Sequence, residues 1–451
     1  MINIFIPNDA QSIIETLEKN GHTAYIVGGC VRDSILGKTP HDFDLCTSAT
    51  PEEMKNILLE YKIYDTGLKH GTITVASEND TYELTTYRVD GEYSDNRHPE
   101  NVKFVDDVKL DLARRDFTIN AMAYNKKSTL VDPFNGIADI KSQLIRCVGN
   151  PDDRFQEDAL RILRAIRFAS TYGFKIENNT KEAIYKNKEL LKNISEERKT
   201  SEFCKLLLTA DTNILMQYKD VFAEFIPEIK PMFNFNQKTK WHCYDIYEHT
   251  VQAVSRAPKD DLITRLALFF HDIGKPETFT EDENGGHFYG HPIMSEEITE
   301  NIMKRMRFDN STIKQVLQLV LNHDNRFSTS EKSARKLLRD YGEIQAKRLL
   351  IIQECDKSAQ SELAQKENYN KDLNIIKQNI EKVVKNQDCF KIKDLKINGN
   401  DLKNIGFVGI EIGKTLNLLL EKVMQNPEFN DRDLLLDLSN ELKENHIIEL
   451  L

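Results

Sequence analysis

The segment from Ala24 to Thr47 constrains the fold of this chain more than any other segment. Its first residues, Ala24–Val27, are aliphatic, aromatic and β-branched, which predicts a short buried strand. Gly28-Gly29 follows and lets the backbone turn tightly and approach a ligand. One or two helical turns are then expected over Cys30–Leu36. A helix that begins after such a turn offers free N–H groups to a phosphate, and the Arg32 guanidinium adds positive charge nearby.

Two aspartates, Asp42 and Asp44, follow the turn. On a strand they would project from the same face, and two such carboxylates repel each other unless a cation lies between them. Because hard oxygen ligands beside a phosphate site suit Mg²⁺, we predict a triphosphate on Gly28-Gly29 and Arg32, with Mg²⁺ on the two aspartates. The alternative is a strand–helix turn with two surface acids. Glu83, on a later predicted strand, is either a third ligand or a solvent-facing residue.

These motifs resemble the class II polymerase-beta-like nucleotidyltransferases, which comprise the tRNA CCA-adding enzymes and the bacterial poly(A) polymerases. The resemblance is carried by Gly28–Asp33 (Gly-Gly-Cys-Val-Arg-Asp), by Asp42–Asp44 and by Arg114–Asp116 (Arg-Arg-Asp). It implies that the two aspartates are catalytic and hold the metal. Arg115 is a bidentate donor suited to a phosphate or a ribose, and the alternative for this motif is a surface ion-pair cluster.

The segment Arg154–Phe168 predicts one continuous helix, in which Asp158 and Arg161 are neighbours on one face. Asp158 can accept a hydrogen bond from the amino group of cytosine or adenine. Arg161 can donate to the ring nitrogen that both bases present. Uracil and guanine carry a carbonyl oxygen in place of that amino group, so the two residues would select C and A without a template. The alternative is a surface ion pair.

The family resemblance also covers Glu157–Arg161 and the arginines that follow. Arg164 is expected near the nucleotide because it still flanks the face of Asp158, whereas Arg167 has turned toward the far side. Both are candidate nucleotide-binding residues. Ser195–Leu208 matches a further family motif that supports this helix.

A second set of candidate ligands follows Trp241. An adjacent His-Asp pair with a distant His and a distant Asp resembles the HD phosphohydrolase superfamily, although single histidines on helices are usually structural. The resemblance implies a divalent metal that would activate water for phosphoester hydrolysis. The predicted ligands are His249, His271, Asp272 and Asp356. Whether His291 and His323 form a second metal position is left open.

The resemblance implies an α+β fold, with a small head that combines a mixed sheet and helices, followed by an all-α neck, body, HD domain and tail. The predicted domains are the catalytic head (1–145), the neck and body for nucleotide selection and RNA binding (146–235), the HD domain (236–365) and a tRNA-binding tail (366–451).

Composition bears on the partner and the compartment. The net charge of −11 argues mildly against nucleic acid, but Lys141–Ala210 and Lys371–Lys403 are net basic and compatible with RNA binding. No apolar run approaches the ~18 residues of a membrane span. The N-terminus does not resemble a signal peptide, and the seven cysteines form no Cys-x-x-Cys pair. A cytoplasmic protein is therefore predicted.

The expected activity is the addition of C, C and A to tRNA from CTP and ATP. The alternatives are an enzyme that adds only the final A, a poly(A) polymerase, and an HD phosphohydrolase or RNA-binding protein with a vestigial transferase. Thr66–Val75 resembles the CCA-adding pattern rather than that of the polymerases. Val89–Val102 is a long polar loop of the kind that, in the family, helps the switch to the final A.

Overall fold

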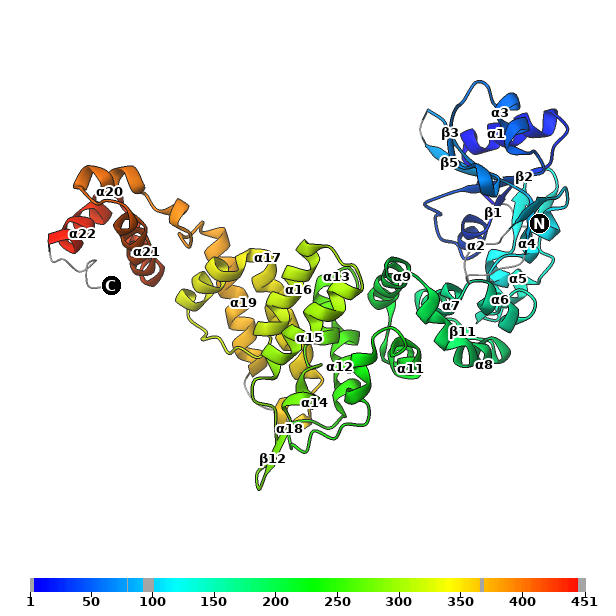
Figure 1. The fold of residues 1–451 in the computed structure, drawn as a ribbon. Coiled ribbons are helices and arrows are strands. Elements are labelled where there is room, and N and C mark those ends of the chain that lie inside the picture. Colours follow the sequence, from blue (N-terminus) through cyan, green and yellow to red (C-terminus); the bar gives the residue numbers. More distant parts are fainter. Residues whose placement is uncertain (1–3, 79, 92–100, 366–368, 445–451) are drawn as a thin grey trace. The chain divides into compact units, whose positions relative to one another are not determined.

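The computed structural model describes residues 4–78, 80–91, 101–365 and 369–444. The chain divides into two compact units, residues 1–227 with 305–307 and residues 228–304 with 308–451 (Figure 1). A mixed sheet lies in the head, at the start of the first unit, and helices make up most of the remaining described chain. This arrangement confirms the predicted α+β head followed by helical domains. Among the described helices, none has the length and apolar character that crossing a membrane requires.

The head is built around a seven-stranded sheet with the strand order β3-β4-β5-β2-β1-β8-β9. Strand β2 runs parallel to β5, and the other neighbouring pairs are antiparallel. The aliphatic residues of β1 are buried, as expected for a central strand. The strands are β1 (Ala24–Val27), β2 (Asp44–Thr47), β3 (Lys62–Gly67), β4 (Thr72–Ala76), β5 (Thr81–Thr86), β8 (Ala123–Asn125) and β9 (Thr129–Val131).

Five α-helices accompany this sheet within the described head. The predicted strand–glycine–helix segment is confirmed, since α2 begins at the second glycine of the turn. The helices are α1 (Asn8–Lys19), α2 (Gly29–Ile35), α3 (Pro51–Ile57), α4 (Val108–Ala113) and α5 (Gly136–Lys141). Strands β6 (Arg88–Asp90) and β7 (Val102–Phe104) pair with each other, and residues 92–100 of the predicted long loop lie outside the described residues.

Strand register brings the candidate acidic residues to one end of the sheet. Val27, the last residue of β1, pairs with Asp44, the first residue of β2. The parallel register between β2 and β5 sets Asp44 beside Glu83. Asp42 lies in the loop before β2, so the prediction that both aspartates share one strand is wrong. On the side of β1, no backbone partner continues past Val27, because Gly28 turns the chain into α2 there.

The neck of the first unit is helical, with one short parallel pair of strands, β10 (Leu144–Ile145) and β11 (Lys175–Ile176). Its helices are α6 (Pro151–Glu157), α7 (Leu160–Tyr172), α8 (Asn178–Asn187), α9 (Glu196–Thr209), α10 (Thr212–Gln217) and α11 (Lys219–Phe222). The prediction of one continuous helix over Arg154–Phe168 is wrong, because Asp158 is extended, with φ −142° and ψ 102°. Its Oδ1 accepts a hydrogen bond from the Leu160 N–H at 3.1 Å, which competes with the helical pattern and starts a new helix.

Helices also make up most of the second unit, whose described residues include a hairpin that the sequence did not predict, β12 (Thr280–Asp282) with β13 (Gly285–His287). Helix α12 packs on α13 and α17, and α13 packs on α16. These helices are α12 (Ile246–Arg256), α13 (Leu262–Phe270), α14 (Lys275–Thr278), α15 (His291–Arg305), α16 (Asn310–Asn322) and α17 (Glu331–Ser358). The rest are α18 (Glu362–Gln365), α19 (Tyr369–Lys385), α20 (Gly399–Ile405), α21 (Ile410–Gln425) and α22 (Arg432–Glu444).

Replacing each of the two adjacent glycines of the turn by alanine should change the free energy of unfolding by different amounts. Gly28 has φ +81°, and a Cβ there would lie 2.9 Å from Arg115 Nη1, whereas a Cβ on Gly29 would meet only Arg32 Nη2 at 3.5 Å. We expect Gly28→Ala to lower the free energy of unfolding of the head by about 1–3 kcal/mol. Gly29→Ala, the matched control, should change it by less than ~1 kcal/mol. Hydrogen exchange of peptides from residues 24–47 in a denaturant series measures both, and equal effects would contradict this account.

Candidate functional site

Three carboxylates gather at the end of β2. Asp44 is exposed there, beside Glu83 of β5, and Asp42 lies in the adjoining loop. Desolvation raises the pKa of the Asp44 carboxyl above its ordinary value, Arg115 acts against this rise, and the negative charges of Glu83 and Asp42 add to it. A divalent cation would relieve this repulsion. Among the described residues, however, these three carboxylates do not form a set whose oxygens all lie within 4.8 Å of one another. The register thus adds Glu83 to the two predicted acids.

Arg115 is held over the glycine turn, close to these acids. Its Nη1 occupies the space that a Cβ of Gly28 would need, and its Nη2 donates to Asp111 Oδ2 at 3.4 Å. Burial lowers the pKa of this guanidinium, but the negative charges of Asp111 and Asp44 raise that pKa further, so the group stays protonated. Its buried Nε has no hydrogen-bond partner among the described residues. Arg115 therefore presents a positive charge and a spare donor at the turn.

Arg32, predicted as a phosphate-binding residue, is buried and already has partners. Its Nε and Nη2 each donate to Asp33 at 2.9 Å, and its Nη1 donates to Asn120 Oδ1. Its guanidinium also lies 5.1 Å and 4.9 Å from the ring centroids of Phe168 and Tyr172 on α7. These contacts join α2 to the neck. A role for Arg32 in phosphate binding stays a prediction.

Asp116 connects the Arg-Arg-Asp segment to α7 through a buried ion pair. Arg164 donates to Asp116 Oδ2 from Nε at 2.9 Å and from Nη2 at 2.7 Å, and Asn120 Nδ2 donates to Oδ1 at 3.0 Å. Burial alone would raise the pKa of the Asp116 carboxyl, but Arg164 and Asn120 outweigh it and lower that pKa to about 2. Arg161 of α7 also donates to the Arg114 carbonyl oxygen at 2.9 Å.

The structure does not pair Asp158 with Arg161, so this prediction is wrong for the conformation described. Asp158 Oδ2 accepts from Arg198 Nη2 of α9 at 2.8 Å, whereas Arg161 Nη1 donates to Glu157 at 2.6 Å. The cause is the break between α6 and α7, which removes the helical spacing that the prediction assumed. Arg198 is the residue that sequence reasoning missed, and its place in the Ser195–Leu208 motif was the available signal.

Arg164 and Arg167 share partners on α7 and α9. The Arg164 guanidinium lies 3.9 Å from Glu202 and 5.3 Å from the Phe168 ring centroid. The Arg167 guanidinium lies 2.5 Å from Glu202 and 4.2 Å from the same ring centroid. Both arginines thus reach Glu202, and the predicted placement of Arg167 on the far side from Asp158 stays a prediction. Their convergence follows from their length, because two long side chains can reach one carboxylate on a neighbouring helix.

A second set of ligand-type side chains converges in the second unit. They come from α12, from the C-terminal ends of α13 and α16, from the start of α15 and from α17. The Nε2 of His249 lies 2.7 Å from Asp356 Oδ1, and the Nε2 of His271 lies 3.2 Å from Asp272 Oδ2. The full set is His249, His271, Asp272, His291, His323 and Asp356. The structure thus brings together the predicted HD ligands and the two further histidines.

These side chains fit a divalent metal ion. In each of the four histidines, Nδ1 lies 2.7–3.3 Å from a backbone carbonyl oxygen, so a proton on Nδ1 leaves Nε2 free to bind metal. The Nε2 of His271 is buried and has no hydrogen-bond partner among the described residues. Imidazole and carboxylate donors of this kind suit transition metals.

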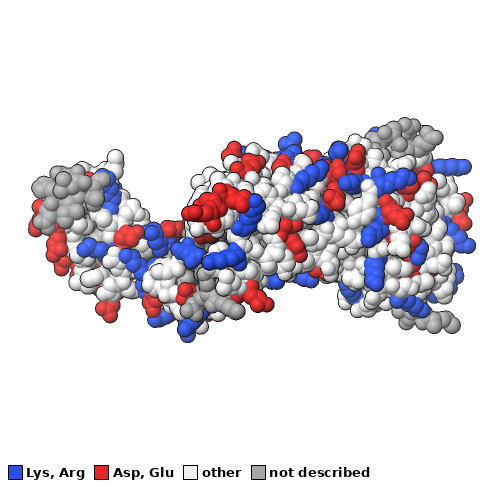
Figure 2. Space-filling view, turned by 90° about the horizontal axis from the view of Figure 1, so that it is seen from below, with Lys and Arg blue, Asp and Glu red and all other residues white. Residues whose placement is uncertain are grey.

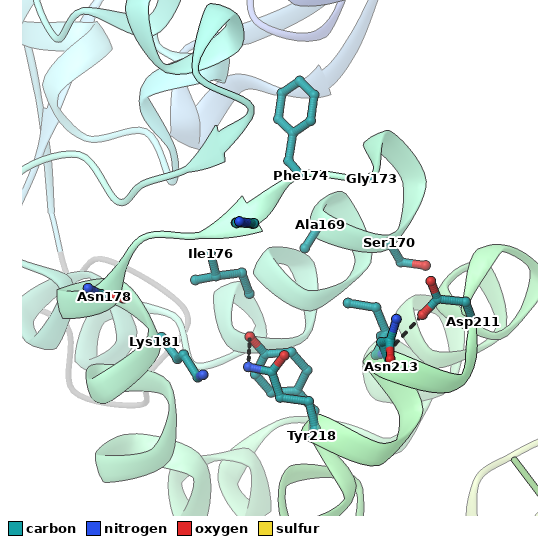
Figure 3. A pocket seen from close by; sticks show the side chains of 13 residues that line it. Ala169, Ser170, Gly173, Phe174, Ile176, Asn178, Lys181, Asp211, Asn213 and Tyr218 are labelled. Atoms are coloured by element: carbon teal, nitrogen blue, oxygen red, sulfur yellow. Dashed lines mark hydrogen bonds between the residues drawn. The ribbon is translucent and has the colours of Figure 1, made fainter.

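A cavity of about 460 Å³ opens in the neck among α7, α8 and α10 (Figure 3). Figure 3 shows Ile176, Lys181 and Tyr218 around it, with Ser170 and Asp211 at another side. Its lining comes from two separate segments, residues 169–181 and 211–218, so no local motif could have predicted it. On the face shown in Figure 2, basic and acidic side chains are interspersed, and the predicted basic RNA-binding surface stays a prediction.

Comparisons with known proteins divide the chain into three matched parts. Residues 24–146 match the family model of the poly A polymerase head domain, and residues 241–360 match the HD domain. Between them, residues 173–233 match a model described as a probable RNA and SrmB-binding site of polymerase A. The predicted domain boundaries themselves stay a prediction.

Curated relatives match over about half of their length. A CCA-adding enzyme of Lactobacillus delbrueckii subsp. bulgaricus is 46% identical over 222 residues, which are 49% of this chain and 55% of that protein. A CCA-adding enzyme of Bacillus velezensis is 49% identical over 229 residues, which are 51% of this chain and 57% of that protein. The chain therefore aligns with little more than half of each relative.

Solved structures share the fold over nearly the whole chain. The Bacillus stearothermophilus CCA-adding enzyme in complex with CTP aligns with a TM-score of 0.72 and 24% identity, over 98% of this chain and 99% of that one. The Thermotoga maritima CCA-adding enzyme complexed with tRNA aligns with a TM-score of 0.59 and 21% identity, over 96% and 95%. At these identities the likeness establishes the fold.

The ion pair of Asp116 predicts a specific pH dependence of stability. Because the pKa of this carboxyl is about 2 in the folded state and 3.8 without its partners, its contribution is present above about pH 4 and is lost as the pH falls toward 2. We expect this loss to amount to about 2 kcal/mol. Asp116→Asn should flatten the acid limb of the unfolding curve of the first unit, whereas Asp153→Asn, an exposed control on α6, should not. An unchanged acid limb in Asp116→Asn would contradict this account.

Proposed function

We propose that this chain, which belongs to the family that unites tRNA nucleotidyltransferases with poly(A) polymerases, adds C, C and A to the 3′ end of tRNA. CTP and ATP are the substrates, and no nucleic-acid template is used. The observation that carries the proposal is the approach of Asp44, Glu83 and Arg115 at the Gly28 turn, with Arg161 and Arg164 of α7 bonded to the same Arg-Arg-Asp segment. The names of the relatives support it.

Asp42 and Asp44 are the proposed ligands of Mg²⁺, with Glu83 as a third candidate. When bound there, Mg²⁺ would supply positive charge for activating the 3′-hydroxyl of the RNA and for stabilising the leaving pyrophosphate. The exposed position of both aspartates leaves room for a triphosphate. The backbone N–H groups of the Gly28-Gly29 turn and the Nε of Arg115, which lacks a partner among the described residues, are suited to bind the phosphates.

Base selection is proposed to involve an exchange of partners at the break between α6 and α7. Asp158 is held by Arg198 and Arg161 by Glu157 in the structure described. A cytosine or adenine can replace these partners, because its amino group donates to Asp158 and its ring nitrogen accepts from Arg161. Uracil and guanine place a carbonyl oxygen against the Asp158 carboxylate, where both groups only accept. Arg164 and Arg167 are proposed to bind the same nucleotide from α7.

The remaining assignments are also proposals. The neck is assigned to nucleotide selection and RNA binding, and the tail from residue 366 to the tRNA. A cytoplasmic location is supported by the free state of all seven cysteines. Phosphoester hydrolysis in the HD domain is a second candidate function, favoured by the convergence of four histidines on Asp272.

One assay separates this function from its rivals. A tRNA that ends at the discriminator base, a tRNA that ends in CC and an unstructured RNA are each incubated with labelled CTP or ATP. The proposal predicts C, C and A on the first, A on the second and little on the third. Addition of A to the second RNA, with no addition to the first, would identify an A-adding enzyme. Long A tails on the third RNA would identify a poly(A) polymerase.

The acidic residues should be essential for transfer. Asp44→Asn removes a charge that the metal needs, so we expect the rate of CMP incorporation to fall by at least ~10³-fold. Asp106→Asn, at an exposed head residue, is the matched control and should keep full activity. Gel assays under single-turnover conditions measure both. An Asp44→Asn enzyme with near-normal activity would remove the proposed metal site.

Asp158→Ala should weaken base choice more than it weakens catalysis. We expect misincorporation of UMP and GMP to rise by about 10–100-fold relative to CMP and AMP, as the loss of about 1–3 kcal/mol of discrimination predicts. Asp153→Ala on α6 is the control. Competition assays with all four nucleotides give the ratios. Unchanged discrimination in Asp158→Ala would rule out the proposed role of this carboxylate.

A further inference from the structure

We propose that the cavity of about 460 Å³ in the neck binds one unpaired nucleotide, with its phosphate at Lys175 and Lys181 and its base among apolar and amide side chains. The nucleotide belongs to a single-stranded RNA segment or is a free nucleoside monophosphate, since both present the same chemistry. The inference rests on the proposed RNA-binding role of the neck. It assigns a site separate from the transfer site proposed at Asp44 and Asp158.

The cavity lies apart from the residues proposed to inspect the base. Helix α7 contributes to both places, but Ser170 at the cavity follows Arg161 by nine residues. With about 3.6 residues per turn and about 1.5 Å per residue, Ser170 lies on the opposite face of α7 and roughly 13.5 Å farther along its axis. Of the described residues that line the cavity, none is a proposed ligand of the metal, the triphosphate or the selected base. The cavity is therefore a second site.

Two lysines give the cavity positive charge that is not neutralised. Within the part of the chain that the structure describes, neither the Lys175 ammonium nor the Lys181 ammonium has a hydrogen-bond or ion-pair partner. By contrast, Lys186 on the same helix as Lys181 pairs with Asp152 at 2.6 Å. Unpaired ammonium groups beside a cavity favour an anionic ligand, and lysine binds phosphate as a point charge.

The lining contains one carboxylate among its described residues, Asp211, and this group is engaged elsewhere. Its Oδ1 accepts a hydrogen bond from the Ile214 N–H at 3.0 Å, which caps the start of α10. Figure 3 shows Asp211 and Asn213 on one side of the cavity and Lys181 and Asn178 on the other. The cavity thus has a positively charged side at which a phosphate would bind.

The interior of the cavity suits a planar base. Ile176, Ile214 and Tyr218 supply apolar surface. Tyr218 is only 2% exposed, and its hydroxyl accepts a hydrogen bond from Gln217 Nε2 at 3.3 Å, while its own O–H has no acceptor among the described residues. The amides of Asn213 and Gln217 each carry a donor and an acceptor, so they can pair with the edge of any base. The volume of about 460 Å³ lies within the range of roughly 300–1,000 Å³ that small-molecule sites span.

The exposure of the lining residues favours a nucleotide that belongs to an RNA strand. Lys175 is exposed and Lys181 is half-buried, whereas Ile176 and Tyr218 are buried. A nucleotide bound in this way would keep its phosphate at the surface, where the strand can continue in both directions. Recognition of single-stranded RNA commonly combines a base removed from its stack with basic side chains along the backbone.

The test uses uridine nucleotides, because the proposed transfer site rejects uracil. Binding of a fluorescent octauridine to the full chain is measured over a salt series, with and without competing UMP. Lys175→Ala/Lys181→Ala removes the phosphate contacts, so we expect the affinity for octauridine to fall about tenfold. The slope of log K against log salt concentration should become shallower by about 0.7–1.4, the value for one or two phosphates on a single strand.

Two further variants separate the cavity from the general charge of the neck. Lys186→Ala/Lys205→Ala removes the same charge from exposed lysines outside the lining and should change the affinity for octauridine by less than about twofold. Asn213→Trp fills the cavity from an exposed position of the lining. This variant should weaken octauridine binding as much as the lysine pair does, with an unchanged unfolding midpoint.

The outcomes distinguish the two sources of the nucleotide and the two proposed sites. Octauridine binding that UMP does not displace would identify an RNA nucleotide, and displacement by UMP would identify a free one. Unchanged octauridine affinity in both Lys175→Ala/Lys181→Ala and Asn213→Trp, or no octauridine binding by the parent protein, would overturn the proposal. Asp44→Asn should bind octauridine normally, and the lysine pair variant should add CMP to saturating tRNA at the parent kcat. Failure of the cavity and failure of the proposed transferase function are therefore told apart.

Discussion

The first unit depends on the buried charge of Asp116 and on the two arginines before it. These three consecutive residues face different partners. The Arg114 carbonyl accepts a hydrogen bond from Arg161, Arg115 lies over the Gly28 turn beside Asp44, and the Asp116 carboxylate binds Arg164. One tripeptide therefore contacts both the acidic end of the sheet and the helix proposed to inspect the base. A buried ion pair with hydrogen bonds on both oxygens is costly to break, so it fixes the distance between these two parts of the first unit.

Local patterns in the sequence were sufficient for the parts of the site that depend on local chemistry. The strand Ala24–Val27, the glycine turn and the helix after it follow from β-propensity, glycine conformation and helix stops, and the structure confirms them. The partner of Asp158 could not be predicted in this way. Its side chain interrupts the helix by capping Leu160, and its charge is neutralised by Arg198, forty residues later in the chain. Competition between a side chain and the backbone, and pairing between distant helices, are decided by packing rather than by spacing.

In the HD centre, too, some features could be predicted from the sequence and others depend on packing. The order of its histidines and aspartates in the sequence was enough to predict a metal-binding set, because the resemblance specified which residue types should recur. The approach of four imidazoles to Asp272 was not predictable, since it depends on how α12, the ends of α13 and α16 and the start of α15 pack together. Each oxygen of this carboxylate meets two imidazole nitrogens, and a single residue thereby links two ligand sets that lie on different helices.

The central claim is that the acidic end of β2 holds metal and triphosphate while the break at Asp158 meets the base. Crystals of the full chain grown with CTP and Mn²⁺ test it most directly, because anomalous scattering locates the ions without assumptions about chemistry. The account predicts an anomalous peak within bonding distance of Asp42 and Asp44, with the cytosine amino group against Asp158. Mn²⁺ bound to the triphosphate away from both aspartates, or a cytosine with no contact to Asp158, would contradict it.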